Sequence, residues 1–351
     1  MTSEQQGEQQ TVRWGFLTTG KIARKVAADL ALVPGSELVA VGARRLESAE
    51  AFVAEHAPGA RAHASYADLV DDDGVDVVYV ASPHALHLEH VRMALEAGKH
   101  VLCEKPVALD LAQAQEMVRL ARHHDRFLME AMWTACHPVV RELRERLASG
   151  ELGTPRTLRA ELGFHVDAAP DDRLLDPVLG ASALLDMGIY PLTLAHLLLG
   201  APERLHAEAN LSERGTDMDV AVLGRYPGGA LATLSASMTS WSDRSAALAT
   251  DRGHVHLEGQ FHHPDAAVFV PRDAAGVEGE PVRITGREPV VGGGYGNEVA
   301  EVARCVREGL RESPWVPHQQ TLALMAQLDD VRRQVGVELP GADPLLPGDA
   351  G

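Results

Sequence analysis

The sequence predicts an α/β protein in which a doubly wound parallel sheet precedes an α+β domain with a large open, mostly antiparallel sheet. In the first third of the chain, strand-like runs alternate with helical stretches of about ten residues or more, on short connections. The β-branched run at residues 75–80 is typical of a strand buried on both faces of a parallel sheet. Beyond about residue 133 this alternation ends, and turn-rich segments join successive strand-like runs, as in antiparallel meanders.

The elements of the first part follow from apolar periodicity and from residues that begin or end helices. Asp110, three residues before Gln113, indicates a capping box at a helix start, and Gly98 is placed to end the preceding helix. We therefore expect strands at 12–17, 37–43, 75–80, 100–103 and 127–131, and helices at 21–32, 46–56, 85–97 and 111–124.

In the second part, two turn sequences identify pairs of neighbouring strands. The turn at 227–229 separates strands at 217–226 and 230–238, and the turn at 251–253 separates strands at 245–250 and 254–257. The remaining expected elements are a strand at 156–164 and helices at 139–148, 180–190, 297–309 and 318–335.

The composition is that of a globular protein with a strongly acidic balance. Apolar residues make up 45% of the chain, and 50 acidic against 32 basic residues give a formal net charge of −18. Such a surface repels phosphate backbones and anionic membranes, which argues against nucleic acid or membrane as a partner. Cys103, Cys136 and Cys305 lie far apart, which argues against a disulfide framework or a Cys-rich zinc site.

The N-terminal residues carry no sign of a targeting segment. Residues 1–10 are polar and lack the basic region and apolar stretch of a secretory signal. No apolar run is expected to approach the roughly 20 residues that a membrane span requires. We therefore expect a cytoplasmic protein.

A glycine-containing turn after the first strand indicates a dinucleotide site. Such a turn needs a glycine where the backbone meets the pyrophosphate and a small residue where the helix packs on the strand. Gly20 and Ala23 meet these needs, whereas Thr18 replaces the first glycine of the G-x-G-x-x-G spacing. The helix N-terminus then faces the anion. The cofactor-binding candidates of this turn are Gly15, Thr18, Thr19, Gly20, Lys21 and Ile22.

The end of the second strand indicates which dinucleotide is bound. Enzymes that use NAD usually carry an acidic residue there for the ribose 2′-hydroxyl, whereas this chain has Arg44 and Arg45. Two guanidinium groups suit a 2′-phosphate through charge-assisted, bidentate hydrogen bonds. On so acidic a chain, this pair favours NADP(H).

Polar residues also follow two later strands, and they are expected at the same carboxyl edge of the sheet, where ligands bind. A Glu-Lys pair closing an apolar strand is unfavourable unless it is paired or functional. Farther along, Asp186 and Tyr190 are four residues apart and share one helix face, which points into the site or caps a buried helix. The cofactor-binding candidates of this edge are Ser82, Pro83, His84, His87, Glu104 and Lys105.

These motifs resemble those of the Gfo/Idh/MocA oxidoreductase family, and within it most closely the branch of dimeric dihydrodiol dehydrogenases and NADP-dependent D-xylose dehydrogenases. The resemblance extends over residues 12–337 and rests on the segments 14–23, 98–106, 130–133 and 185–191. The Glu-Lys-Pro element at 104–106 is specific in this context. The Asp-x-Gly-x-Tyr element selects the branch, because many relatives have His in the position of Tyr190.

The resemblance implies three catalytic residues. Lys105 would be the acid/base residue, followed by a cis bond to Pro106, and Tyr190 would hydrogen-bond the reacting hydroxyl with Asp186 beside it. The implied reaction transfers a hydride between NADP(H) and a CH–OH group (or CH–CH group) of a sugar, polyol or trans-dihydrodiol. Burial and the charge of oxidised nicotinamide should lower the lysine pKa from roughly 10.4. Tyr190 could instead pass the proton with Lys105 stabilising the phenolate, and the sequence leaves both routes open.

The resemblance also implies the substrate residues and an oligomer. Trp133 and Arg173 would line the substrate pocket, although the branch often has an Arg-Phe pair after the tryptophan and this chain has Ala135-Cys136. Together with the change of pattern near residue 133, we expect a flexible leader (1–11), a dinucleotide-binding Rossmann domain (12–132), an α+β substrate and oligomerisation domain (133–340) and a tail (341–351). A homo-oligomer, dimer or tetramer, would form through the open sheet.

Three alternatives remain. A metal site could involve His254, His256, His262 and His263, but no matching Cys or carboxylate pattern accompanies them, so we expect solvent-facing histidines and no metal. A non-catalytic NADP-binding regulator would not need Lys105, Asp186 and Tyr190. An inositol or amino-sugar dehydrogenase of the same family is disfavoured by the tyrosine at 190, and fold resemblance does not fix the substrate.

Overall fold

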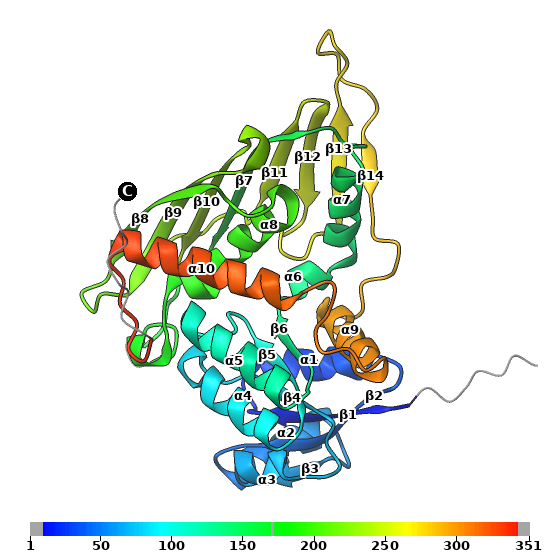
Figure 1. Ribbon diagram of the computed structural model, residues 1–351, viewed down its shortest axis with the longest axis vertical. Coiled ribbons are helices and arrows are strands. Elements are labelled where there is room, and N and C mark those ends of the chain that lie inside the picture. The colour runs from blue at the N-terminus through cyan, green and yellow to red at the C-terminus, as the bar shows by residue number, and fades with distance from the viewer. Residues whose placement is uncertain (1–9, 170–171, 343–351) are drawn as a thin grey trace, which may run out of the picture.

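The first sheet has six parallel strands in the order β3-β2-β1-β4-β5-β6 (Figure 1). The computed structural model describes residues 10–169 and 172–342, so most of the expected leader and tail lies outside the described residues. The strands are β1 (Val12–Leu17), β2 (Ser36–Gly42), β3 (Arg61–His63), β4 (Val77–Val80), β5 (His100–Glu104) and β6 (Leu128–Ala131). The strand order reverses between β1 and β4, which is the switch point where ligands bind in such sheets.

Helices pack on this sheet much as the sequence predicts. Asp110 caps α5 by accepting the backbone N–H of Gln113 at 2.8 Å, as expected from the capping box. The short strand β3 and helix α3 were not predicted, because each spans too few residues for a periodic pattern. The helices are α1 (Lys21–Leu30), α2 (Leu46–His56), α3 (Tyr66–Val70), α4 (His87–Glu96) and α5 (Leu111–His123).

The second sheet has eight strands in the order β14-β13-β12-β11-β7-β10-β9-β8, with only β7 and β10 paired in parallel. Both predicted turns join adjacent antiparallel strands. The strands are β7 (Pro155–Gly163), β8 (Arg204–Leu211), β9 (Asp217–Arg225), β10 (Leu231–Ser237), β11 (Ala246–Thr250), β12 (Gly253–Glu258), β13 (Ala266–Pro271) and β14 (Val282–Ile284); β8, β13 and β14 were not predicted. The predicted fold class, a doubly wound parallel sheet followed by an open and mostly antiparallel one, is confirmed.

One face of this sheet is covered by helices and the other is left open (Figure 1). Two further helices, α6 and α9, lie between the sheets, and α9 packs against α1, α6 and β1. This part of the chain therefore joins the two domains next to the edge where ligands are expected. The helices are α6 (Trp133–Cys136), α7 (Pro138–Ala148), α8 (Ile189–Leu199), α9 (Tyr295–Arg307) and α10 (His318–Val335).

The helix predicted at 180–190 forms differently. Leu184–Gly188 is one wide turn of π-helix, and α8 follows it directly. The first amides of this turn are held from outside the helix, because the N–H of Leu184 donates to Asp217 Oδ2 at 2.7 Å. Such turns are frequent at functional sites. Sequence periodicity does not distinguish them from α-helix.

One apolar stretch is longer than expected. Pro177–Leu199 is long and apolar enough to cross a membrane by length and composition. However, 78% of its most apolar window is buried inside the protein. The stretch therefore contains the core helix of the second domain, because α8 at its end packs against β7, β10 and α10.

Candidate active site

The turn between β1 and α1 keeps the backbone shape of a dinucleotide site although a threonine occupies its first glycine position. Thr18 has a φ of 107°, which β-branched residues rarely adopt. Its backbone N–H donates to the Gly42 carbonyl at 3.1 Å, and its hydroxyl donates to the Ala81 carbonyl at 3.0 Å. These bonds tie the ends of β1, β2 and β4 together. A residue held in a strained conformation in this way is typical of a functional turn.

The first turn of α1 faces open space. Gly20 is its N-cap residue, and no side chain in the described part of the chain caps the helix. A Cβ atom on Gly20 would meet no atom within 4 Å. Thr19 and Ile22 are half-buried beside it, and Lys21 is exposed. Free N–H groups facing open space are what a pyrophosphate requires, so these residues fit the expected dinucleotide.

Gly15 is a packing residue, which corrects its assignment to the cofactor site. It is buried within β1, where a Cβ atom would lie 2.9 Å from Val75 Cγ1 and 3.2 Å from Leu69 Cδ1. The glycine is needed because α3 and the segment before β4 approach the strand closely. Its place three residues before the turn gives it no access to the site.

Arg44 and Arg45 follow β2 at the carboxyl edge of the first sheet, as the sequence predicts. Both side chains are exposed, and Arg45 is the N-cap residue of α2. Among the described residues neither arginine forms an ion pair. Two arginines without a carboxylate partner at this edge suit the 2′-phosphate of NADP(H).

In the segment after β4, the His87 and Ser82 side chains make internal contacts of the protein. His87 is fully buried, with its ring nitrogens 2.8 Å from the Ser82 carbonyl and 3.0 Å from the Pro106 carbonyl. Burial lowers its pKa to about 3. His87 therefore joins two turns of the backbone and has no surface for a ligand, which corrects its assignment to the cofactor site. The Ser82 side chain is likewise buried and contacts His90 Nδ1 at 2.9 Å, whereas Pro83 is partly exposed.

Lys105 lies at the end of β5, where three of the predicted site residues meet. The bond to Pro106 is cis, as expected. The Lys105 ammonium donates to the Asp186 carbonyl at 2.8 Å and lies 4.8 Å from the centroid of the Tyr190 ring. The structure thus brings together Lys105, Asp186 and Tyr190 from segments about eighty residues apart.

Glu104 is not an open ligand group, because its carboxylate is used within the protein. It is buried and accepts the phenol O–H of Tyr79 at 2.5 Å, and its other oxygen accepts the backbone N–H of Lys105 at 3.2 Å. Burial raises the pKa of Glu104, and the hydrogen bond from Tyr79 opposes that rise. Its negative charge raises the pKa of Lys105 and so partly opposes the effect of burial.

The Asp186 carboxylate faces His84, whose pKa burial lowers, and the guanidinium of Arg173. Its Oδ1 lies 3.8 Å from His84 Nε2 and 3.7 Å from Arg173 Nη1. Asp186 Oδ2 is buried and has no hydrogen-bond partner in the described part of the chain. His84 is itself buried, with Nδ1 3.2 Å from the Gly180 carbonyl. Asp186 thus faces Arg173 with Oδ1, while its Oδ2 is buried and unpartnered among the described residues.

Aromatic side chains from three segments form one wall beside Tyr190. The Trp133 indole N–H donates to the Tyr190 hydroxyl at 3.1 Å. The Trp133 ring stacks on Tyr295, with centroids 4.3 Å apart and planes 15° apart, and on His263 at 5.2 Å. The His262 ring lies 5.1 Å from the Tyr190 ring. Trp133 and Tyr190 were predicted, whereas Tyr295, His262 and His263 were not assigned to the site.

The environment of the site shifts the pKa values of Lys105 and Tyr190 in opposite directions. Burial lowers the pKa of Lys105, and the charges of Asp186 and Glu104 partly oppose this. Burial raises the pKa of Tyr190, and the charge of Glu104 raises it further. The lysine is therefore closer to losing its proton than an exposed lysine, and the tyrosine is farther from losing one.

The histidines of the second domain correct one expectation. His262 is buried and His263 half-buried against Trp133, so these two do not face solvent; burial lowers the pKa of His262 to about 3. His256 is exposed on β12, as expected. Within residues 10–169 and 172–342, no group of three or more His, Cys, Asp or Glu side chains is arranged to hold a metal ion.

Some of these residues left a weak signal in the sequence. Three consecutive glycines before Tyr295 indicate a close backbone approach, which a functional loop often needs. Adjacent His262 and His263 next to Phe261 form an aromatic cluster in a chain with only 4% aromatic residues. Neither signal specifies what the cluster contacts, because that depends on long-range packing.

Two family models match most of the chain. One, described as an oxidoreductase family with an NAD-binding Rossmann fold, matches residues 12–132, and the other, described as the GFO/IDH/MocA C-terminal domain, matches residues 140–258. The trans-1,2-dihydrobenzene-1,2-diol dehydrogenase of Mus musculus is 36% identical over 341 residues, covering 94% of this chain and 98% of the relative.

Solved structures share the whole fold. KijD10, a 3-ketoreductase from Actinomadura kijaniata in complex with NADP, has a TM-score of 0.78 at 26% identity, over 93% of this chain and 98% of that one. The aldose-aldose oxidoreductase from Caulobacter crescentus has a TM-score of 0.82 at 21% identity over the same shares, a likeness of fold. The two sheets and their order along the chain are thus an arrangement that other oxidoreductases also have.

Proposed function

Because the chain belongs to the Gfo/Idh/MocA oxidoreductase family, we propose that it is an NADP(H)-dependent enzyme acting on a carbon-bound hydroxyl of a sugar, polyol or trans-dihydrodiol. The observation that carries this proposal is the position of Lys105 at the carboxyl edge of the first sheet, where its Nζ contacts both the Asp186 carbonyl and the Tyr190 ring. NADP(H), when bound, supplies or accepts the hydride. The protein's residues hold it, orient the substrate and move the proton.

The cofactor is held at two places on the first domain. The open first turn of α1 after Gly20 receives the pyrophosphate, and Thr18 fixes the shape of that turn. Arg44 and Arg45, which have no carboxylate partner in the described residues, bind the 2′-phosphate. A neighbour of similar fold, KijD10, has been solved with NADP, which supports the same cofactor.

Lys105 is the proton carrier. In the oxidative direction its neutral amine accepts the proton of the substrate hydroxyl, and in the reductive direction its ammonium returns that proton. Burial lowers its pKa, which makes the neutral amine accessible at a pH where an exposed lysine is charged. The Asp186 carbonyl fixes the direction of the ammonium by accepting one of its protons at 2.8 Å.

Tyr190 orients the substrate oxygen and keeps its own proton. Its hydroxyl oxygen accepts the Trp133 N–H, which leaves the phenol O–H free to donate to the reacting oxygen. Burial and the charge of Glu104 raise its pKa, which disfavours the phenolate that the alternative proton route requires.

The aromatic wall favours a ring as the substrate. Tyr295, which is partly exposed and stacked on the buried Trp133, offers an aromatic surface to the site, and such surfaces bind the apolar face of a sugar or a cyclohexadiene diol. The relatives named trans-1,2-dihydrobenzene-1,2-diol dehydrogenase fit a cyclic vicinal diol. Arg173, with half of its side chain exposed, borders the same site through Asp186.

The pH dependence of oxidation tests the assignment of Lys105. Because the neutral amine is the active form, kcat/KM should rise with pH through the pKa of Lys105 and then level off. Arg173→Ala removes a positive charge that lowers this pKa, so the rising limb should move to higher pH. Asp186→Asn removes a charge that raises it, so the limb should move to lower pH. Shifts of the same sign in both variants would contradict the assignment.

The activity itself is tested by following reduced nicotinamide with NADP⁺ or NAD⁺ across aldoses, inositols and trans-dihydrodiols. Oxidation of a cyclic diol or pyranose that is faster with NADP⁺ is the expected result. Turnover on inositols alone would favour the inositol alternative. No turnover on any substrate, together with tight NADPH binding, would favour a non-catalytic regulator.

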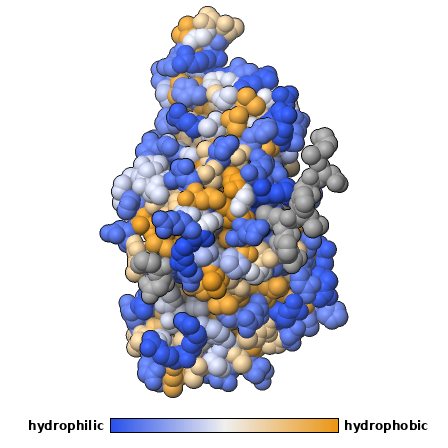
Figure 2. Space-filling model, turned by 90° about the vertical axis from the view of Figure 1, so that its left-hand side faces the viewer, coloured by the Kyte–Doolittle hydropathy of each residue, from blue (hydrophilic) through white to orange (hydrophobic). Residues whose placement is uncertain are grey.

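The open sheet is the surface for self-association. Its uncovered face and rim expose large apolar side chains, with 53% of Leu223, 46% of Leu231 and 71% of Trp241 accessible. Apolar surface also gathers over the middle of the side at which β8 lies (Figure 2). We expect a homo-oligomer by light scattering, and Leu223→Glu should shift it towards the monomer by placing a charge in that interface. A monomeric wild-type protein would contradict this.

A further inference from the structure

Asp29 is a buried carboxylate whose hydrogen-bond partners all come from the other end of the chain. It lies on α1, with 7% of its surface exposed. Its oxygens accept the backbone N–H of Gly293 at 2.9 and 3.0 Å, of Tyr295 at 3.0 Å and of Gly296 at 3.3 Å. A carboxylate that accepts several backbone N–H groups is a strong anchor. It also caps α9, whose own N-cap residue, Gly294, has no side chain to do so.

The segment held by Asp29 is the strap, which we define as residues 285–294. It runs from β14 along one edge of the molecule to the start of α9 (Figure 1). Two of its glycines are needed for close approach. A Cβ atom on Gly292, whose φ is +62°, would lie 2.1 Å from Asp29 Oδ1. A Cβ atom on Gly294, whose φ is +107°, would lie 3.2 Å from the Trp133 ring. The glycines therefore let the end of the strap approach both Asp29 and Trp133 closely.

Contacts continue from the strap to the reacting groups. Tyr295, the first residue of α9, stacks on Trp133 at 4.3 Å. Trp133 in turn donates its indole N–H to the Tyr190 hydroxyl at 3.1 Å. A continuous series of contacts thus leads from Asp29 on α1, through Tyr295 and Trp133, to Tyr190.

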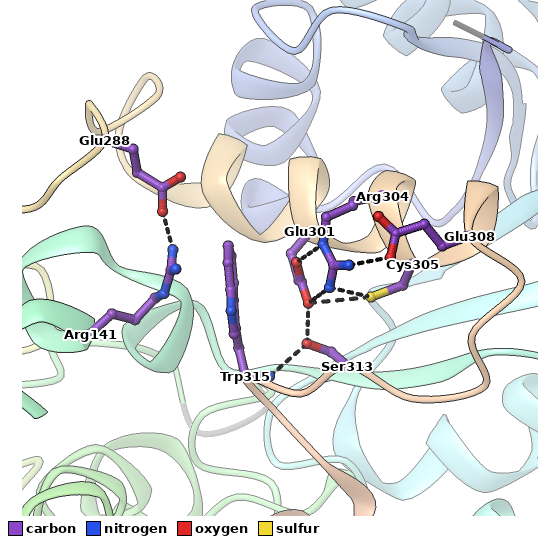
Figure 3. Close-up of polar contacts among 8 residues, drawn as sticks. All are labelled: Arg141, Glu288, Glu301, Arg304, Cys305, Glu308, Ser313 and Trp315. Carbon is purple, nitrogen blue, oxygen red and sulfur yellow. Dashed lines mark hydrogen bonds and ion pairs between the residues drawn. The ribbon is translucent and has the colours of Figure 1, made fainter. Parts of the chain in front are cut away.

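The other end of the strap, and the far side of α9, are also fixed. Arg287 binds Glu142 and Glu145 on α7 at 2.7 and 2.8 Å. Figure 3 shows Arg141 of α7 paired with Glu288 of the strap and stacked against Trp315, with its guanidinium carbon 3.3 Å from the ring centroid.

From Trp315 the contacts return to α9. The Trp315 backbone N–H donates to Ser313 Oγ at 3.0 Å, and the Ser313 hydroxyl donates to Glu301 at 2.5 Å (Figure 3). Glu301 also holds Arg304 on the same helix. Asp29 adds direct hydrogen bonds between the first domain and this junction, beside the packing of α9 on α1 and β1.

We propose that Asp29 is a positioning residue for the substrate: through the backbone of Gly293, Tyr295 and Gly296 it sets the Tyr295–Trp133 stack relative to the cofactor helix α1. The N-terminus of α1 is where the pyrophosphate is expected, so one helix carries the cofactor at one end and the substrate wall at the other. The inference rests on the proposed function, because it assigns Trp133 and Tyr295 to substrate binding. Asp29 itself touches neither substrate nor cofactor.

The expected signature is a loss in KM with a smaller change in kcat. Without the carboxylate, the three amides lose their acceptor and the stack is free to move, whereas Lys105 keeps its contact with the Asp186 carbonyl. Misplacement of a binding wall by about 1 Å can change rates by up to about a hundredfold. We expect Asp29→Ala to lower kcat/KM by about tenfold or more, mostly through KM, with NADPH affinity unchanged. Asp29→Asn, which keeps one acceptor oxygen, should lie between the wild type and Asp29→Ala.

A double-mutant cycle separates positioning from general destabilisation. If Asp29 acts through the stack, Asp29→Ala should have little further effect on kcat/KM in a Tyr295→Ala background. Glu55→Ala is the matched control, since it removes an exposed carboxylate on α2 that contacts α1 through Arg24 at 2.6 Å. It should leave kcat and KM unchanged.

Hydrogen exchange tests the hydrogen bonds of Asp29 without any substrate. The amides of Gly293, Tyr295 and Gly296 should exchange slowly in the wild type and fast in Asp29→Ala, with little change in Glu55→Ala. Unchanged exchange at these amides, a folded Asp29→Ala with wild-type kcat/KM, or additive effects in the cycle would each overturn the proposal. If the wild type turned over no substrate, the proposed function would fail by itself, and the exchange of these amides would still decide the anchor.

Discussion

Lys105→Ala should lower turnover by about a hundredfold to ten-thousandfold while NADPH affinity stays close to that of the wild type. The physical reason is that the variant removes an amine that contacts both the Asp186 carbonyl and the Tyr190 ring and whose pKa is lowered by burial. Tyr190 does not replace it, because burial raises its pKa. The measurement is steady-state turnover with the best substrate, together with NADPH titration followed by fluorescence.

Lys105→Arg is the informative control for this prediction. Arginine keeps the positive charge but does not lose its proton in the working pH range. If Lys105 carries the proton, Lys105→Arg should be as inactive as Lys105→Ala, and small primary amines should restore part of the activity of the alanine variant. If the lysine contributed only its charge, Lys105→Arg would keep much of the wild-type turnover, and the proton-carrier role would be wrong.

Removing Arg44 and Arg45 together should change the cofactor preference more than any other substitution in the first domain. Each exposed guanidinium lacks a carboxylate partner in the described residues and can make charge-assisted bonds to a 2′-phosphate. Such bonds are worth about tenfold to a hundredfold in affinity each. We therefore expect the double alanine variant to bind NADPH at least about tenfold more weakly and to bind NADH as the wild type does.

The control for this prediction separates a specific contact from a change in net charge. Arg119→Ala also removes one positive charge, but from an exposed pair with Glu116 on α5, so it should leave both affinities unchanged. Raising the ionic strength should weaken NADPH binding to the wild type and have less effect on the Arg44 and Arg45 double variant. Equal losses for NADPH and NADH would contradict binding of the 2′-phosphate by these arginines.

The local elements of the fold were readable from the sequence because they depend on short-range patterns. The helices expected at 46–56 and 318–335 have the predicted ends, and the cap at Asp110 forms as expected. Short elements such as β3 were missed, since three residues give no periodicity. The π-turn at Leu184–Gly188 was missed as well, because it depends on a hydrogen bond from Leu184 to Asp217, more than thirty residues away.

The candidate site was readable only where one rule applies. In a parallel sheet, residues that follow strands meet at the carboxyl edge, so Thr18, Arg44, His84 and Lys105 were all expected there, and the structure places them there. That rule gives the edge but not the direction of each side chain. His87 satisfies the rule and is nevertheless buried between two carbonyl groups.

The sequence by itself determined the parallel-then-antiparallel architecture and a lysine at the ligand edge of the first sheet, because strand and helix periodicity and the carboxyl-edge rule are local. Only the tertiary structure decided which side chains face Lys105. Trp133, Tyr190 and Tyr295 meet from separate segments, and Asp29 reaches the strap across more than 260 residues of chain. Contacts of that range follow from how the two domains pack, and no local pattern encodes them.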